Sequence, residues 1–481
     1  MKRGSITPFC ALSMMLIASL LFALLESARV YGLDRYATLR AENGVDSVCA
    51  EFQPLLWKEY GLLFLDGAYG TEEFNLAYVS ENLKAQIEKS CQTEDGLLEW
   101  IGIDLFGLRV QDVVLEGYAL ATDDNGELFL NYVAERMKET LPIGLAEDIY
   151  EQYILGNELE KEYDGVEESV VNAEQTLRGT RTEEREQIDM LESVAQMQKS
   201  FTLQTILEDV SAVSQKASQV QSKLQTREKT EGTMKLTAEK EWYRKLLVLA
   251  YLEEYFASYT NKKEGHFLEY EMEYVLCGKD TEWENLDATF DRILLVREAA
   301  NLCYLLQDEE KMQLADGLAN LLGLLVEGNP VAIKVFQAGI VGAWAYLESV
   351  LDVRALIAGD AISLVKQESE WTTDVANIIT AFSANAKAKN CEGGWKYADY
   401  LKMLLFFSKD ETLAFRMMEA MELSLQSYAD YQNCKMNQML VAMKCKICFE
   451  SEPVFFSLVT VGDYSLGTFG FEKNVKRSYI P

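Results

Sequence analysis

The feature that most constrains this chain is an uncharged, largely apolar run near its start, residues 4–25. As a helix rising about 1.5 Å per residue, the run spans roughly 33 Å, which matches a bilayer hydrocarbon core of about 30 Å. No charged side chain interrupts it, and a helix satisfies its backbone hydrogen bonds internally. The sequence therefore predicts that residues 1–30 form a short cytoplasmic tip followed by a transmembrane anchor.

A cleaved signal peptide is the alternative interpretation of this run. Signal peptides have shorter apolar cores and small residues at the cleavage site. A cut after Ala28 would place Glu26 where a small neutral residue belongs, so we favour an uncleaved anchor. Lys2 and Arg3 favour a cytoplasmic N-terminus, although arginines also follow the run. The short N-terminal tail supports this orientation and predicts a single-pass protein of the cell membrane whose bulk is extracytoplasmic.

The composition excludes several classes of function. Forty-five basic residues against 77 acidic ones give a formal net charge of −32, which repels nucleic acid. His266 is the single histidine, so catalysis by histidine and multi-histidine metal sites are not expected. We predict no cofactor. Only six prolines interrupt the chain, which leaves long stretches free to be helical and favours a mainly α fold with some β (α+β).

Three segments are predicted after the anchor. Residues 31–155 are expected to form a membrane-proximal α/β module, 156–241 a helical or coiled-coil stalk, and 242–481 a helical domain with a C-terminal β tail. Within the first segment, the β-branched and aromatic residues of 110–120 predict a strand. The apolar spacing of residues 127–140 predicts a helix that follows after a short turn.

The stalk prediction rests on a heptad-like pattern in residues 203–224. Its apolar positions alternate in spacing between three and four: Leu203, Ile206, Val210, Val213, Ala217, Val220 and Leu224. This alternation is typical of a coiled-coil seam, so self-association through 203–224 is one expectation. An amphipathic helix lying on its own domain is the alternative.

The C-terminal part is rich in wide apolar helices. Residues 332–351 are apolar enough for a second membrane span, but polar side chains near both ends favour a buried packing helix. Arg297-Glu298 and Asp352-Val353-Arg354 are expected to be buried or half-buried ion pairs that fix the register of their helices. Alternating apolar and β-branched residues in 453–471, broken by glycines, predict a terminal β-hairpin.

Two constellations could carry chemistry. Cys445 and Cys448 form a C-x2-C pair, which is half of a four-ligand zinc site. A disulfide or redox pair and unpaired buried cysteines are the other interpretations. Glu269 and Glu273 would share one helix face and could act as an acid/base pair, but a chain with 77 acidic residues makes such pairs by chance. We therefore expect no catalytic site.

The N-terminus resembles that of a known family. The residues RGSIT at 3–7 and LLESAR at 24–29 resemble pseudopilins of the tight-adherence (Tad/Flp) pilus system. In that family a prepilin peptidase cuts after the glycine, which implies a processing site between Gly4 and Ser5. The family has a glutamate at the fifth mature position, where this chain has Phe9.

Several later segments resemble an uncharacterised family of membrane-anchored proteins of Gram-positive anaerobes, found with Tad-like pilus genes. The segments are residues 46–52, 56–62, 271–279, 297–301 and 344–354. The resemblance implies a non-enzymatic, structural or accessory component of a Tad-like pilus or secretion apparatus. It would bind membrane lipid through its N-terminal helix and protein partners in the assembly. The alternatives are a sensor or adhesin unconnected with pili and, less favoured, a carboxylate-based extracellular hydrolase.

Overall fold

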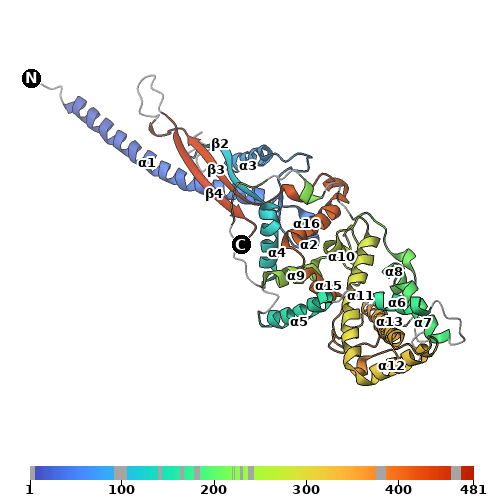
Figure 1. Ribbon diagram of the computed structural model, residues 1–481. Helices are drawn as coiled ribbons and strands as arrows, with labels where there is room; N and C mark the ends of the chain where they lie inside the picture. Colours follow the sequence, from blue (N-terminus) through green and yellow to red (C-terminus); the bar gives the residue numbers. More distant parts are fainter. Residues whose placement is uncertain are drawn as a thin grey trace, which may run out of the picture. The chain divides into compact units, whose positions relative to one another are not determined.

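The computed structural model is mostly helical (62%) with a small antiparallel sheet, which confirms the mainly α fold class with some β (Figure 1). It describes residues 6–91, 106–138, 143–162, 167–177, 185–218, 220, 223–227, 231–236, 243–374, 386–456 and 467–480. The chain divides into two compact units. We refer to them as the sheet unit and the helical unit.

The sheet unit comprises Met1–Asp124, Glu228–Ala238 and Tyr428–Pro481. Its elements are α1 (Ile6–Cys49), α2 (Pro54–Tyr60), β1 (Leu65–Asp66), α3 (Leu76–Cys91), β2 (Leu108–Leu120), β3 (Met439–Ser451) and β4 (Phe469–Ser478). Strand β3 pairs antiparallel with each of the other three strands. In the register, Ile447 lies opposite Val113 of β2 and Lys473 of β4. The sheet therefore joins strands from the two ends of the chain.

The core of the sheet unit lies between the sheet and two helices. The second half of α1 contributes residues spaced three or four apart, all fully buried: Leu33, Ala37, Ala41, Val45 and Val48. The buried face of α3 contributes Val79, Leu83 and Ile87. A β-carbon at Gly44 would clash with the Ile87 side chain, so glycine at this position allows α1 and α3 to approach closely.

The helical unit comprises Asn125–Arg227 and Glu239–Ser427. Its α-helices are α4 (Glu127–Met137), α5 (Ile143–Glu162), α6 (Glu167–Leu177), α7 (Arg185–Met197), α8 (Thr202–Ile206), α9 (Arg244–Tyr255), α10 (Glu271–Cys277), α11 (Glu282–Gln307), α12 (Glu309–Leu324), α13 (Pro330–Ile357), α15 (Tyr397–Phe406) and α16 (Asp410–Gln426). The apolar run 332–351 lies within α13 and is mostly buried, as expected for a packing helix.

Local sequence signals set the starts of the long helices in this unit. Thr281 and Glu284 form a reciprocal capping box at the start of α11. Asp308 caps α12 by accepting the backbone N–H of Lys311. Asn329 caps α13, whose first residue is Pro330, where a proline is well tolerated because its missing N–H would have no partner in the helix.

A buried charge cluster joins α11 and α13. Arg297 and Asp352 are buried and ion-paired as expected, but they pair with each other rather than with residues of their own segments. Arg297 Nη2 lies 2.9 Å from Asp352 Oδ2, and both side chains are fully buried. Lys366 pairs with Asp352 Oδ1 at 2.5 Å and also with Glu348. The hydroxyl of Tyr400 accepts a hydrogen bond from Arg297 at 3.0 Å. Two cations and two carboxylates therefore compensate one another inside the helical unit.

Both interpretations of residues 203–224, a coiled coil and an amphipathic helix, required a continuous helix, which the described residues do not form. Helix α8 ends at Ile206, and two short 3-10 turns follow, Val210–Ala212 and Leu224–Thr226. The described residues between them, 213–218, 220 and 223, form no helix. The Ser218 N–H donates to the Asp280 carbonyl at 2.9 Å, which holds this non-helical chain against the helical unit. Five of the heptad positions are buried in this unit: Leu203, Ile206, Val213, Val220 and Leu224. The pattern thus reflects burial within the helical unit, and self-association through 203–224 stays a prediction.

The strand, turn and helix predicted near residues 110–140 are confirmed as β2, the 3-10 turn Asp123–Gly126, and α4. The C-terminal strands are also present, but their positions differ from the prediction. The paired strands are β3 and β4, whereas residues 453–456 form no strand and 457–466 lie outside the described residues. The division into units likewise departs from the predicted segments: it separates Asp124 from Asn125 and groups β3 and β4 with the N-terminal elements.

Replacing Arg297 by methionine should lower the free energy of unfolding of the helical unit by about 3–5 kcal/mol, because the loss of one partner leaves buried carboxylates with too little positive charge. The measurement is urea unfolding of the full chain in detergent, followed by tryptophan fluorescence, since Trp344 and Trp371 are buried in this unit. Exposed Lys334 on α13 provides the control, and Lys334→Met should change stability by less than about 0.5 kcal/mol. Equal effects of the two variants would contradict the compensating role of the cluster.

Candidate membrane-anchoring site

The first half of α1 is an exposed apolar helix. Its large side chains are solvent-accessible along the described run, with Leu16 68% and Leu24 59% exposed. Among the described residues, α1 is the one helix long and apolar enough to cross a membrane. By length and composition, this helix could be a membrane anchor or a signal sequence.

A group of polar residues, here called the polar collar, lies where the apolar run ends. It consists of Glu26, Arg29 and Ser451 (the last residue of β3). The Glu26 side chain is almost fully buried, and its Oε1 lies 2.7 Å from Arg29 Nη1. Arg29 Nη2 also donates to Ser451 Oγ at 2.6 Å. The collar therefore connects the end of the apolar run directly to the central strand of the sheet.

The second carboxylate oxygen of Glu26 binds backbone. Oε2 accepts the N–H groups of Val454 at 3.1 Å and Phe455 at 2.6 Å. The Phe455 ring stacks on that of Phe22, with ring centroids 6.4 Å apart. A buried carboxylate is costly unless it is paired and hydrogen-bonded, and here both conditions are met. Sequence reasoning missed this role of Glu26, although an acid directly after an uncharged run, with arginine three residues later, is a readable signal.

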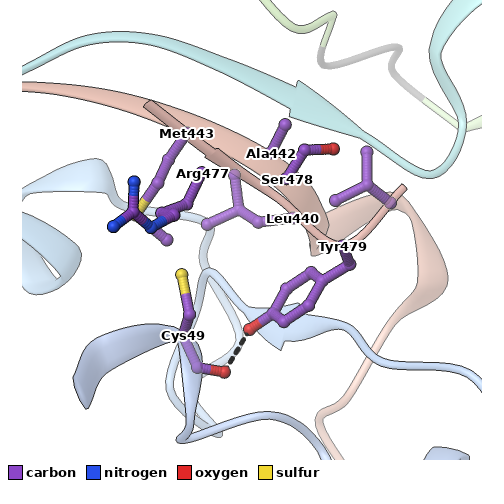
Figure 2. Close-up of a pocket in the computed structure, with 8 residues that line it drawn as sticks. Cys49, Leu440, Ala442, Met443, Arg477, Ser478 and Tyr479 are labelled. Atoms are coloured by element: carbon purple, nitrogen blue, oxygen red, sulfur yellow. Dashed lines mark hydrogen bonds between the residues drawn. The ribbon is translucent and has the colours of Figure 1, made fainter. Parts of the chain in front are cut away.

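A small pocket lies at the other end of α1 (Figure 2). It is lined by Cys49, Leu440, Val441, Ala442, Met443, Arg477, Ser478 and Tyr479, and its volume is about 80 Å³. The Tyr479 hydroxyl donates to the Cys49 carbonyl at 2.5 Å, and burial raises the pKa of the Cys49 thiol to about 11. A space this small is well below that of a typical ligand site, so it is a packing gap beside a protonated thiol.

The structure does not bring Cys445 and Cys448 together. Both lie on β3, where side chains alternate between the two faces. Cys445 points into the core and is fully buried, whereas Cys448 is half-buried on the opposite face. Burial raises the pKa of Cys445 to about 12, so its thiol is unreactive. A disulfide between the two would require β3 to be distorted. No group of three or more metal-ligating side chains occurs within the described residues.

Gly4 and Ser5, the predicted processing site, lie outside the described residues.

The two carboxylates considered for acid/base work have different environments. Glu269 precedes α10 and lies 2.7 Å from Lys262, whose hydrogen bond lowers the pKa of this carboxyl. Glu273 is fully buried on α10, and burial raises its pKa to about 7. Its Oε1 accepts from Tyr397 Oη and the Tyr259 N–H, both at 2.8 Å. Within the described chain its Oε2 has no hydrogen-bond partner. Glu269 and Glu273 therefore do not lie together in one acid/base site.

Glu273→Gln should stabilise the protein at pH 8 and lose this advantage as the pH falls. The unfolded carboxyl ionises near its ordinary pKa of 4.5, while the folded one stays protonated up to about pH 7. The folding of wild type therefore becomes less favourable as the pH rises from about 4.5 to about 7. Above that range the loss reaches about 3 kcal/mol. Urea unfolding of both proteins between pH 4.5 and 8 measures the difference.

Glu269→Gln is the matched control. Because the pKa of Glu269 is lowered in the folded state, removing its charge should cost a little stability, with no further change between pH 5 and 8. If the stability of wild type and of Glu273→Gln changes in parallel with pH, the predicted loss of stability at high pH does not come from Glu273.

Comparison with known proteins assigns the chain to a family. The comparisons with curated proteins and with solved structures gave no match. Residues 180–451, more than half of the chain, match a family of unknown function, DUF5702. The matched region includes α11, α13 and β3 but leaves out α1. The chain therefore belongs to the DUF5702 family.

Proposed function

We propose that this protein is a non-enzymatic, single-pass membrane protein whose bulk is extracytoplasmic, and that it is a structural or accessory component of a Tad-like pilus or secretion apparatus. The observation that carries the proposal is α1 itself. One unbroken helix has an exposed apolar first half and a second half whose buried face packs into a folded unit. Such a helix can hold the sheet unit against a membrane.

The polar collar supports an anchor that is retained rather than removed. A signal-peptide cut after Ala28 would separate Glu26 from Arg29 and remove the acceptor of two backbone N–H groups. Each buried group left without a partner would cost about 1–3 kcal/mol. A chain that folds with this collar therefore keeps residues beyond the apolar run attached to the sheet.

The role in a pilus-like assembly is supported by the resemblance of RGSIT and LLESAR to pseudopilins.

A non-enzymatic role is supported by charged side chains of the helical unit that form structural contacts. Arg297 and Asp352 join two helices, and Glu419 accepts the Leu224 N–H and the Tyr274 hydroxyl, both at 2.7 Å. These groups are engaged in holding the fold together.

Charges introduced in the apolar run should release the protein from membranes. A lysine at the centre of a spanning helix costs about 2.5–3.5 kcal/mol, so Leu16→Lys with Leu20→Lys should abolish membrane integration. The measurement is fractionation of cells, with extraction by salt and then by detergent. Wild type should need detergent. Leu39→Lys is the control, because Leu39 is 51% exposed on the same helix beyond the apolar run, and this variant should behave as wild type. A double variant that still needs detergent would overturn the anchor.

The assignment to an assembly needs a separate experiment. The full-length protein is cross-linked in intact cells, solubilised in detergent and purified, and pilus or secretion components should be recovered with it. A protease test addresses orientation independently: protease added to intact cells should digest the helical unit. Recovery of the protein without any such component after cross-linking would count against the assembly role and leave the anchor standing.

A further inference from the structure

We propose that residues 453–456, here called the post-β3 segment, form a second membrane contact that lies at the surface of the same leaflet from which α1 emerges. The inference rests on the proposed anchoring function of α1. We expect the post-β3 segment to contact lipid at the boundary between acyl chains and headgroups. The segment has the sequence Pro-Val-Phe-Phe and directly follows the central strand of the sheet.

The depth of the segment follows from its contact with α1. The Phe455 ring stacks on Phe22, which lies within the apolar run. Phe22 is three residues before Leu25, the end of that run, or roughly 4.5 Å along the helix axis. If the apolar run fills the hydrocarbon core, Phe455 is therefore at or just below the membrane surface.

The neighbouring side chains on α1 favour lipid as the occupant. Leu21, Leu24 and Leu25 are 54%, 59% and 48% exposed, while Phe22 is half-buried beside Phe455. The segment thus covers one side of the helix at a depth where the other sides would meet acyl chains. The four residues of the segment, 453–456, are themselves half-buried and apolar.

The first part of the segment's backbone meets a condition for lying at a membrane surface. Irregular backbone is tolerated next to lipid only where its polar groups have protein partners. Pro453 has no N–H to satisfy. The next two N–H groups, of Val454 and Phe455, both donate to Glu26 Oε2. Arg29 compensates the charge of Glu26 at 2.7 Å, so the acceptor brings no uncompensated charge to this depth.

Photo-cross-linking of the full chain tests the proposal. Benzoyl-phenylalanine replaces Phe455 in protein reconstituted into vesicles of phosphatidylcholine and phosphatidylglycerol, and lipid adducts are counted by mass spectrometry after irradiation. Phe9, which is 69% exposed in the apolar run, is the positive control. Phe201, which is 56% exposed in the helical unit, is the control for an exposed ring outside the anchor. A second probe at Phe456 serves if substitution at Phe455 disturbs the stack.

The expected result is an adduct yield at Phe455 or Phe456 several-fold above that at Phe201 and close to that at Phe9. Adducts at Phe9, with yields at both Phe455 and Phe456 no higher than at Phe201, would overturn the second contact while the anchor stands. Absence of adducts at Phe9 would instead overturn the anchoring function on which the inference rests.

Discussion

The bond between Glu26 and Arg29 determines how a helix suited to lipid can continue into a unit folded in water. A carboxylate at this position must be compensated, and Arg29 does so on the same helix. Arg29 also donates a hydrogen bond to Ser451, and Glu26 also accepts one from the Val454 N–H, shortly after Ser451. Because Ser451 ends β3, and β3 pairs with the other three described strands, the collar joins the apolar first half of α1 to the end of the central strand of the sheet. The buried apolar face of α1 then extends this connection as far as Cys49.

An excess of acid in the chain bears on how buried carboxylates are stabilised. The whole chain has 77 acidic and 45 basic residues, so there are too few cations to pair with every carboxylate. Buried carboxylates therefore also use neutral donors: Glu282 accepts the Tyr270 N–H at 3.0 Å, and Glu419 accepts the Leu224 N–H at 2.7 Å. Hydrogen bonds of this kind stabilise the charged form without a counter-charge. Arg297 and Lys366 are placed where two long helices and the following loop meet, so that one cluster holds three segments.

Local signals made part of this structure predictable. The uncharged run, the turn before α4 and the β-branched residues of β2 each act over a few neighbours, and all three elements form as expected. The engagement of Arg297 and Asp352 in buried ion pairs was predictable because isolated charges in apolar helices must be compensated. That they pair with each other depends on the packing of α11 against α13, which no local pattern indicates. The 3-4 spacing of 203–224 predicted a helix that the described residues do not form. Non-helical chain can bury the same residues when a neighbouring surface supplies backbone hydrogen-bond partners such as Asp280. The C-terminal strands were misplaced because their pairing depends on β2, more than 300 residues away in sequence.

The position of β3 also limits what the family region can do alone. The DUF5702 match ends at residue 451, where β3 ends, yet all of the strands that pair with β3 lie outside residues 180–451. A strand of 13 residues with mostly buried side chains cannot leave its hydrogen-bonding edges unpaired without inviting association with other chains. Helices α1 and α3, which cover the core of the sheet unit, are also outside the match. The family region therefore includes the central strand of a sheet whose other described strands and covering helices come from flanking sequence.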